Sequence, residues 1–270
     1  MNIELSVIIV NYNGYKYLKD CFDSLNQQLK GISFEIIVID NASSDASCAF
    51  IKTHYPEIKL IESKDNLGFG KGNNEAVKQA AGNYLLLINN DTVVLDSLLP
   101  VFEMLRTNPE IGAATIKMLD GNQDYATSVG NFPNPANMFK MQKMQQAGLE
   151  IQADHFSKKS YDADWLSGSF IAMPKKVYQE IGGFDEDYFL YVEDVDFSKR
   201  IADKGYKRIF LPNQSYIHYV GFNKSKNPML VKGYQLYISK HFTGFKKMIM
   251  QAALFANHLV KKAKSRLKLD

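Results

Sequence analysis

The sequence predicts an α/β fold built on a doubly wound, mainly parallel sheet. Short apolar segments alternate with segments of helical periodicity over the first hundred residues, as in successive strand–helix units. Three of these segments are nearly continuous apolar runs, which is typical of strands buried on both faces. They lie at 5–10, 34–40 and 85–88, and polar residues end or follow them at 11–13, at Asp40 and at 89–91. Because open α/β sheets bind ligands beyond the carboxyl ends of their strands, this repetition favours a ligand site over three unrelated turns.

Length and composition indicate a globular protein of ordinary type. The 270 residues suit one large domain or two small ones, and 46% hydrophobic with 23% charged residues is usual for a soluble chain. The apolar runs are too short to span a bilayer, and residues 1–4 lack the basic segment and long apolar core of a signal peptide. Two cysteines, Cys21 and Cys48, are too few for a disulfide framework. We therefore expect a cytoplasmic protein in which both cysteines act as small apolar residues.

The net charge of +3 is unevenly distributed along the chain. Residues 245–270 contain seven Lys and Arg against one Asp, a charge of +6, which leaves the first 244 residues at −3. A mildly acidic body argues against nucleic-acid binding, which requires a broad basic surface. The basic end predicts contact with an anionic partner.

Local patterns predict the elements of the first half. Leucine and phenylalanine recur at helical spacing between residues 15 and 29, which predicts a helix there. Residues 41–45 are rich in N-cap types and lead into a helix towards His54. The other expected elements are a strand at 58–61, a glycine-rich loop at 66–74 that opens a helix through Ala80, a helix at 97–107 and a strand at 111–118.

The second half is less regular. Periodicity weakens between 120 and 164, which indicates an insertion or loop region whose methionines either line an acceptor groove or fill gaps in the packing. Regular elements then return. They are a strand at 165–173, a helix begun by Pro174, a turn at 182–185, a helix to about Lys204 after an aromatic run at 188–192, strands at 206–211 and 215–220, and a helical region from 229 with a break at Gly244.

The glycine-rich loop matches no standard nucleotide motif. A dinucleotide fingerprint beginning at Gly68 or Gly70 requires glycine at 73 or 75, where the chain has Asn73 and Glu75. The P-loop pattern, H-E-x-x-H and paired C-x-x-C are also absent from the sequence. Two interpretations remain open: the loop's backbone amides and Lys71 approach a phosphate, or the glycines serve a tight turn.

Carboxylates supply the remaining chemistry. Asp40 and Asp91 end strands, and Glu193, Asp194 and Asp196 follow the aromatic run. One carboxylate together with a diphosphate suits Mg²⁺ or Mn²⁺, and another can accept a proton from an attacking hydroxyl. The alternative for the Glu193–Asp194 pair is a purely structural helix N-terminus, where negative charge is favoured.

Seven motifs in order resemble the family 2 glycosyltransferases. They are SVIIVNYNG at 6–14, VIDNASSD at 38–45, NLGFG at 66–70, LINNDT at 87–92, SGS at 167–169, GFD at 183–185 and EDVDF at 193–197. The resemblance spans about residues 4–222 and is strongest to the rhamnosyltransferase-type branch. It implies a GT-A fold and an inverting, metal-dependent transfer of a sugar from a nucleotide donor.

The resemblance also implies roles for individual residues on the donor side. The nucleotide would contact Val10, Asn11, Tyr12, Asp40, Asn66, Lys71 and Asn90. Asp91 matches the last Asp of the family's D-x-D motif and would bind Mn²⁺ or Mg²⁺ bridging the diphosphate. The chain departs from that motif in having Asn89 at the position of the first Asp, which reduces the local negative charge. His218 matches a late histidine that reaches the metal or diphosphate, although a strand histidine can also be structural.

On the acceptor side, Asp194 matches the family's catalytic base, which deprotonates the acceptor hydroxyl. Glu193 would orient the acceptor, and the assignment of the base between these two carboxylates stays open. Trp165 and Tyr191 would form walls for a sugar ring, or else belong to the core.

The predicted domain division places a GT-A domain at 1–222 and a basic helical extension at 223–270. Within the domain, the nucleotide-binding half is about 1–118 and the acceptor half is 119–222. In the extension, apolar residues recur at helical spacing with lysines at both ends, at Phe245, Ile249, Ala252, Ala256, Leu259 and Ala263. Such a helix suits the anionic inner face of the plasma membrane. The alternatives are packing on the body and a homodimer contact.

The expected reaction is transfer from dTDP-rhamnose or a UDP-sugar to a glycan or lipid-linked acceptor in cell-surface polysaccharide synthesis. One alternative is a sugar nucleotidyltransferase, which would need a basic glycine-rich loop near the first strand, whereas 11–14 has no Lys or Arg. The other is a non-catalytic protein that binds sugar nucleotides without turnover.

Overall fold

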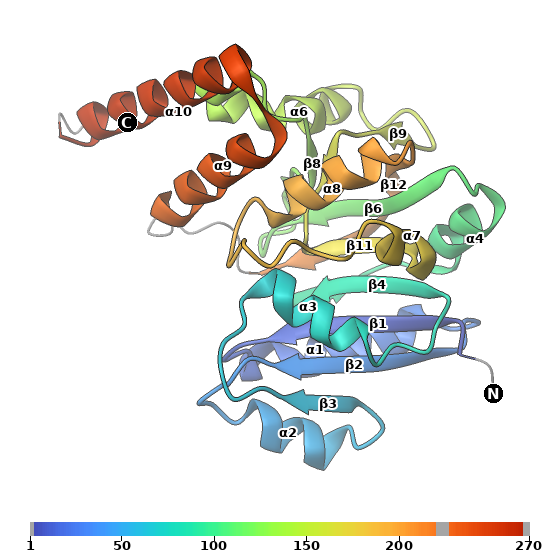
Figure 1. Ribbon diagram of the computed structural model, residues 1–270. Coiled ribbons are helices and arrows are strands. Elements are labelled where there is room, and N and C mark those ends of the chain that lie inside the picture. Colours follow the sequence, from blue (N-terminus) through green and yellow to red (C-terminus); the bar gives the residue numbers. More distant parts are fainter. Residues whose placement is uncertain (1–2, 220–226, 267–270) are drawn as a thin grey trace.

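The computed structural model describes residues 3–219 and 227–266. A mixed sheet forms its centre, with strand order β3-β2-β1-β4-β11-β6-β12-β5 (Figure 1). The first four strands are parallel, and β1 lies between β2 and β4, so the carboxyl ends of these three strands lie side by side. Their bounds are Leu5–Asn11 for β1, Phe34–Asp40 for β2, Lys59–Glu62 for β3 and Tyr84–Asn89 for β4.

The second half of the sheet contains the antiparallel strands. β11 pairs antiparallel with β4 and β6, β12 runs parallel to β6, and β5 is antiparallel to β12. The main strands of this half are β5 Thr92–Val94, β6 Ile111–Leu119, β11 Phe170–Pro174 and β12 Lys207–His218. Two short strands extend the sheet: β7 Tyr125–Ala126 pairs with β6, and β9 Tyr161–Asp162 pairs with β12. A separate two-stranded sheet consists of β8 Val129–Gly130 and β10 Trp165–Leu166. The predicted α/β fold with a doubly wound, mainly parallel sheet is confirmed.

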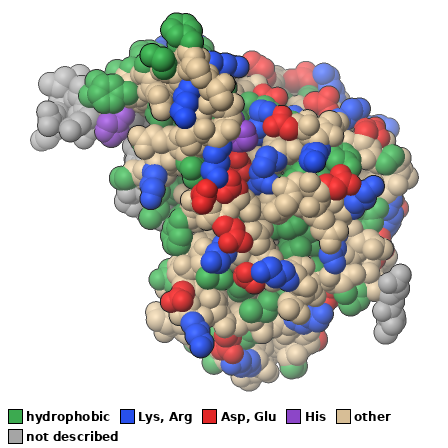
Figure 2. All heavy atoms as spheres, in the orientation of Figure 1, with side chains coloured by type: hydrophobic (Ala, Val, Ile, Leu, Met, Phe, Trp, Pro, Cys, Tyr) green, Lys and Arg blue, Asp and Glu red, His purple; other side chains and the backbone are tan. Residues whose placement is uncertain are grey.

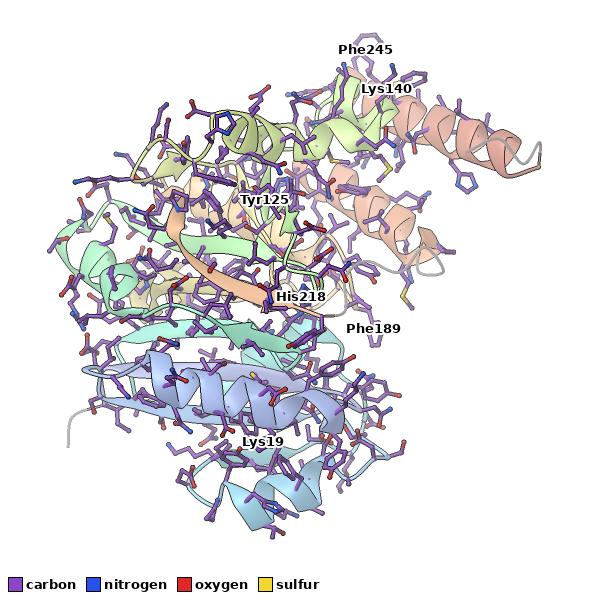
Figure 3. All side chains as sticks on the ribbon, turned by 180° about the vertical axis from the view of Figure 1, so that it is seen from behind. Lys19, Tyr125, Lys140, Phe189, His218 and Phe245 are labelled. Atoms are coloured by element: carbon purple, nitrogen blue, oxygen red, sulfur yellow. The ribbon has the colours of Figure 1, made fainter. Side chains whose placement is uncertain are left out.

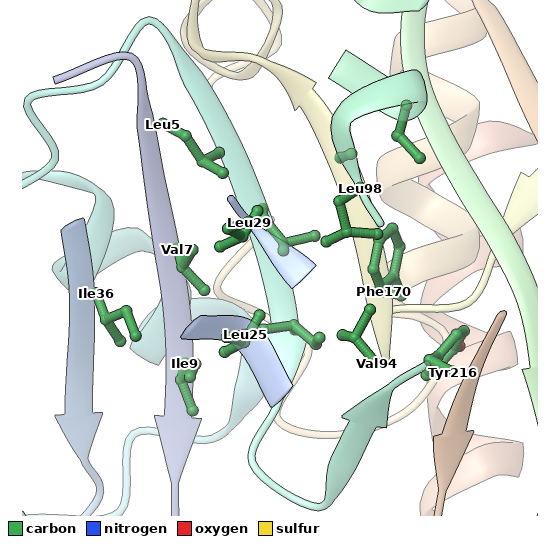
Figure 4. Close-up of a cluster of buried hydrophobic side chains, with 14 of the residues drawn as sticks. Leu5, Val7, Ile9, Leu25, Leu29, Ile36, Val94, Leu98, Phe170 and Tyr216 are labelled. Atoms are coloured by element: carbon green, nitrogen blue, oxygen red, sulfur yellow. The ribbon is translucent and has the colours of Figure 1, made fainter. Parts of the chain in front are cut away.

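Helices cover both faces of the sheet because the central strands are apolar on both sides. Val7 and Ile9 of β1 belong to one core with α1 and α4, whereas Ile8 belongs to a second core with α3, α7 and α8. Figure 4 shows the first core, where Leu25 and Leu29 lie against Val7 and Ile9. The helices are α1 Tyr15–Gln28, α2 Ser47–His54, α3 Phe69–Val77, α4 Leu99–Thr107, α7 Lys175–Glu180 and α8 Glu193–Asp203.

A third core joins the C-terminal helices to the body. It contains Met138 and Met144 together with Tyr237 of α9 and Leu254 of α10. Tyr188, Val192 and Val195, around the start of α8, also belong to it. These methionines are therefore buried packing residues. The helices involved are α5 Pro135–Phe139, the 3-10 helix η1 Met141–Gln145, α6 Gln146–Ala153, α9 Asn227–His241 and α10 Gly244–Arg266. No helix within the described ranges is long and apolar enough to cross a membrane.

Three predicted elements differ in the structure. The helix after the glycine-rich stretch already begins at Phe69, so Gly70, Lys71 and Gly72 lie within α3 and not in a loop. The predicted strand at 165–173 is two strands, β10 and β11, separated by a turn at 167–169. The two late strands are one strand, β12, whose register against β6 shifts between Leu211 and Ser215. Val220 and the predicted boundary at 222–223 lie outside the described residues.

The segment at 120–164 has more structure than an insertion loop. It contains β7, β8, α5, η1, α6 and β9, each only a few residues long. Short elements carry too little periodicity for a sequence pattern to identify them. The predicted break near Gly244 is present, because α9 ends at His241 and α10 begins at Gly244, whose φ is 53°.

Candidate functional site

Three predicted residues at adjacent strand ends form one hydrogen-bonded group, which we call the strand-end cluster: Asn11, Asp40 and Asn90. The amide nitrogen Nδ2 of Asn11 donates to Oδ2 of Asp40 at 2.7 Å, and Nδ2 of Asn90 donates to Oδ1 of Asn11 at 2.7 Å. The second carboxylate oxygen of Asp40 accepts the backbone N–H of Ser43 at 2.8 Å. Asn11 and Asp40 are buried, so the cluster is a fixed feature at the carboxyl edge of the sheet.

Glycines allow close approach around this cluster. A Cβ on Gly14 would lie 1.9 Å from Nδ2 of Asn90, so only glycine fits between β1 and α1. A Cβ on Gly72 would lie 3.1 Å from a methyl of Val10, so α3 packs closely on the end of β1. Tyr12, directly after β1, is exposed and open to solvent beside the cluster.

Asp91 and His218 form the second predicted group. Antiparallel pairing of β5 with β12 places His218 opposite Thr92, and the N–H of Tyr219 donates to the backbone carbonyl of Asp91 at 3.0 Å. As a result, Nε2 of His218 lies 3.3 Å from Oδ1 of Asp91. Nδ2 of Asn89 lies 3.1 Å from the same imidazole nitrogen. His218 lies at the end of the sheet (Figure 3).

The Asp91–His218 pair has the donor atoms for a divalent ion. Two ligands of one Mg²⁺ or Mn²⁺ ion each lie about 2.1 Å from it, and a 3.3 Å separation between the oxygen and the nitrogen is compatible with that geometry. Among the described residues there is no group of three or more His, Cys, Asp and Glu side chains placed for a metal. The pair therefore fits an ion that takes its remaining ligands from phosphate oxygens and water, as Mg²⁺ and Mn²⁺ commonly do.

Glu193 and Asp194 occupy the first turn of α8, after an unusual backbone. Tyr191 and Val192 have φ values of 72° and 73°, in the left-handed region that side chains disfavour, especially a β-branched one. Strain of this kind persists only where surrounding contacts impose it, and it is concentrated at functional sites. The backbone N–H groups of Gly168 and Val195 donate to Oδ2 and Oδ1 of Asp194 at 3.1 and 2.9 Å.

The two carboxyl groups differ in their surroundings. Glu193 is 6% exposed, and its Oε2 has no hydrogen-bond partner among the described residues. Burial, and after it the charge of Asp194, raises the pKa of Glu193 to about 8. Burial also raises the pKa of Asp194, but its two backbone hydrogen bonds oppose that shift, and its side chain is partly exposed. Glu193 therefore favours its protonated form more than an ordinary carboxyl group does, and Asp194 is the more accessible carboxyl group of the pair.

One turn connects the two halves of the site. Gly168 donates its N–H to Asp194, and the carbonyl of Ser169 accepts the N–H of Asn89 at 3.1 Å. The strand end that carries Asp91 and the helix that carries Asp194 therefore contact the same three residues, 167–169. The SGS motif lies at this turn, but the sequence predicted a continuous strand there, and the hydrogen bond from Gly168 to Asp194 had no sequence signal.

The remaining predicted residues lie around these groups. Asn66 is exposed, and its Oδ1 accepts the N–H of Gly68 at 2.9 Å. Lys71 is partly exposed in the first turn of α3. Trp165 and Tyr191 both pack against the third core, and the Trp165 ring lies directly over Gly130. Both aromatic residues therefore have a packing role, and their predicted contact with a sugar ring stays a prediction.

A further group near α8 was missed by sequence reasoning; we call it the Asp196 clasp: Asp196, Arg200 and His241. Asp196 is buried and accepts Nε of Arg200 at 2.8 Å and Nε2 of His241 at 2.7 Å. Burial alone would raise the pKa of Asp196, but the His241 hydrogen bond and the Arg200 charge outweigh it and lower that pKa. Because His241 belongs to α9, the clasp ties the C-terminal helices to α8, the helix that carries Asp194.

Comparisons with known proteins identify relatives of this chain. The chain is 23% identical over 245 residues to an N-acetylglucosaminyl-diphospho-decaprenol L-rhamnosyltransferase of Mycobacterium tuberculosis, covering 83% of this chain and 78% of the relative. It is 27% identical over 224 residues to the rhamnosyltransferase WbbL of Escherichia coli K12, covering 79% of this chain and 82% of the relative.

Solved structures show the same fold. GalNAc-T7 with UDP, GalNAc and Mn²⁺ superimposes with a TM-score of 0.65 at 17% identity, over 88% of this chain and 48% of that chain. A Pyrobaculum calidifontis mannosyltransferase with GDP-Man and Mn²⁺ gives a TM-score of 0.63 at 16% identity, over 98% and 76%. These neighbours are GT-A glycosyltransferases, which confirms the predicted GT-A fold. The family model "Glycosyl transferase family 2" matches residues 6–169, and the chain therefore belongs to glycosyl transferase family 2.

Proposed function

We propose that the protein transfers a sugar from a nucleotide-diphosphate donor to an acceptor hydroxyl, with inversion at the anomeric carbon. The observation that carries the proposal is the arrangement around the 167–169 turn. On one side lies the strand end with Asp91 and the strand-end cluster, and on the other lies the accessible carboxylate of Asp194. This arrangement supports a donor-binding region and a catalytic base that lie close together at one edge of the sheet.

The donor would bind at the strand-end cluster, with the base against Asp40, Asn11 and Tyr12 and with Val10, Asn66, Lys71 and Asn90 as further contacts. The buried, hydrogen-bonded side chains of the cluster offer fixed polar groups to a pyrimidine edge. Two relatives are rhamnosyltransferases, and a fold neighbour, a Staphylococcus aureus TarS fragment, was solved with UDP-GlcNAc. This supports dTDP-rhamnose or a UDP-sugar as donor.

Asp91 and His218 would bind Mn²⁺ or Mg²⁺ together with the donor diphosphate. The bound ion would neutralise negative charge that develops on the leaving diphosphate. Asn89 is not a carboxylate and adds no charge, and its Nδ2 contacts Nε2 of His218, so this contact would be given up when that nitrogen binds the ion. With one protein carboxylate at this position, we expect ion and donor to bind together more tightly than either binds alone. A mixed oxygen and nitrogen ligand pair favours Mn²⁺ over the harder Mg²⁺.

Asp194 would act as the general base. Burial raises the pKa of Asp194, and a carboxylate with a higher pKa is a stronger general base at neutral pH. As the acceptor hydroxyl loses its proton to Asp194, its oxygen forms the new bond to the anomeric carbon. The bond from that carbon to the diphosphate breaks on the opposite side, which inverts the configuration. Glu193, protonated and buried beside Asp194, would orient the acceptor and keep a second negative charge out of the site.

The acceptor is proposed to be a lipid-linked glycan of cell-surface polysaccharide synthesis. The Mycobacterium relative acts, by its name, on an N-acetylglucosaminyl-diphospho-decaprenol. An acceptor of that chemistry would place the protein in the cytoplasm at the inner face of the plasma membrane.

Replacing Asp194 by Asn tests the base. Asn keeps the shape and cannot accept the proton, so we expect transfer to fall by about 10²- to 10⁴-fold, with donor affinity unchanged. Asp203→Asn, at the far end of the same helix and exposed, is the matched control and should retain full turnover. Full activity of the Asp194→Asn variant would refute the assignment.

Two alternatives give different results in the same assays. A sugar nucleotidyltransferase would release pyrophosphate from a nucleoside triphosphate and a sugar 1-phosphate. A non-catalytic binding protein would bind the donor, but would show neither transfer nor slow donor hydrolysis with Mn²⁺.

A further inference from the structure

The outer face of α10 is apolar and uncovered. It comprises Phe245, Met248, Ile249, Phe255, Leu259 and Val260, all of them exposed, and Phe245 and Phe255 are 75% and 63% exposed. At about 100° per residue, these six positions fall within less than half of the helix circumference, so they share one side of the helix. Figure 3 shows Phe245 pointing away from the body, and Figure 2 shows green apolar side chains gathered over α10 at the upper left.

The opposite face of α10 is fixed to the body, so the exposed face is not the result of a detached helix. Met250 and Leu254 are buried in the third core. Nδ2 of Asn257 donates to the backbone carbonyl of Phe139 at 2.6 Å. A groove of about 550 Å³ between α9 and α10 is lined by Val231, Leu254 and Phe255 and by the polar residues Gln235, Gln251 and His258, so the apolar face ends at this groove.

Charge identifies the partner that suits this face. Residues 245–270 carry +6, with Lys246 and Lys247 at the start of α10 and a run of basic residues after Val260. A second copy of the chain would bring the same positive charge against it, which opposes a symmetric contact. A bilayer with anionic headgroups matches both properties, because lysines contact the headgroups while the apolar face enters the acyl region.

We propose that the outer face of α10 is a docking surface for an anionic lipid bilayer. The proposal deepens the proposed function, because docking would hold the site beside a lipid-linked acceptor. The connection to the site is direct. α9 packs on the backbone before Glu193, since a Cβ on Gly233 would lie 2.7 Å from the carbonyl oxygen of Tyr191. Lys240 contacts Asp185 and Asp187 at 2.6 Å each, and His241 belongs to the Asp196 clasp.

The experiment measures vesicle binding of the full chain without any substrate. Wild-type protein should co-sediment with vesicles of phosphatidylcholine and phosphatidylglycerol, bind those of phosphatidylcholine alone about tenfold more weakly, and dissociate as salt is raised. Phe255→Glu should weaken binding to the anionic vesicles by about tenfold or more, because it places a charge in the apolar face. Gln251→Glu adds the same charge to the same helix outside that face and should bind within about threefold of wild type.

Three results would overturn the proposal: no binding to anionic vesicles, equal losses for Phe255→Glu and Gln251→Glu, or a wild-type dimer that binds no vesicles and dissociates in Phe255→Glu. Thermal unfolding and donor binding of both variants verify that they fold. Because vesicle binding is measured without donor or acceptor, it stands if the proposed transfer reaction is wrong. Conversely, donor hydrolysis in solution tests the reaction without vesicles.

Discussion

The Asp196 clasp predicts that a residue of the C-terminal helices controls turnover. His241→Ala removes one of the two hydrogen bonds to a carboxylate that is 1% exposed, at 2.7 Å. It also removes the contact of the imidazole with the Tyr237 ring, whose centroid lies 4.4 Å away. A hydrogen bond to a charged group contributes about 1.5–3 kcal/mol, so we expect unfolding free energy to fall by about 2 kcal/mol.

The effect on activity follows from the position of Asp196, two residues after Asp194 on α8. Loosening this turn displaces the proposed base, and a small displacement of a catalytic group lowers kcat by about ten- to a hundredfold. Donor affinity should not change, because the strand-end cluster lies on β1, β2 and the residues after β4. Steady-state kinetics with isothermal titration of the donor separates these quantities. Differential scanning calorimetry should show Tm lower by about 4–8 °C.

Two further variants make the test specific. His241→Gln retains an N–H donor of similar reach and should recover most of kcat, which a purely apolar packing role would not predict. Ser239→Ala, on the same helix, changes only a local hydrogen bond to the carbonyl of Leu236 and should behave as wild type. The reasoning is refuted if His241→Ala keeps wild-type kcat, or if it loses donor affinity in place of turnover.

Three other predictions concern the site itself. Asp91→Ala should abolish the increase in donor affinity that Mn²⁺ produces, about tenfold or more by titration calorimetry, and an unchanged Mn²⁺ effect would remove Asp91 from the metal site. Glu193 has a folded pKa of about 8, above its unfolded value, so wild-type stability should decrease as pH rises from about 5 to 8. Glu193→Gln should reduce that decrease to the part due to Asp194, whose pKa is also raised, and should be more stable by about 2 kcal/mol at pH 9 in denaturant titrations; parallel wild-type and variant curves would contradict it. Gly14→Ala should lose donor binding in thermal-shift assays and about 2 kcal/mol of stability, because its methyl would overlap Asn90; wild-type behaviour would show that the turn relaxes.

The parallel half of the sheet was predictable because its strands carry their own signals. β2 spans Phe34–Asp40 as predicted, since an apolar run ends sharply at a carboxylate. The same logic placed Asn11, Asp40 and Asn90 together, because parallel neighbours bring their carboxyl ends to one edge. β12 was predicted as two strands because Pro212 and the polar residues after it interrupt the apolar pattern, whereas pairing with β6 carries the strand through a shift in register.

Contacts between segments that lie far apart in the sequence left no pattern from which they could be predicted. The start of α3 was misplaced because the loop ends at Gly68, whose φ of 78° and close approach to the carbonyl of Phe189 are tertiary features. The hydrogen bond from Gly168 to Asp194 is made by a backbone group, which sequence patterns cannot identify. His241 lies in the region that was predicted to be helical, and only the docking of α9 brings it to Asp196.

The left-handed backbone at Tyr191 and Val192 has a consequence for when the site becomes complete during synthesis. Each such residue costs about 1–3 kcal/mol, and the packing of α9 on this segment at Gly233 is among the contacts that offset the cost. α9 leaves the ribosome after every strand of the sheet and after α8. A nascent chain can therefore form the strand-end cluster before the segment that carries Asp194 has its full set of contacts. Order of synthesis would thus delay the proposed reaction until the last helices have folded onto the body.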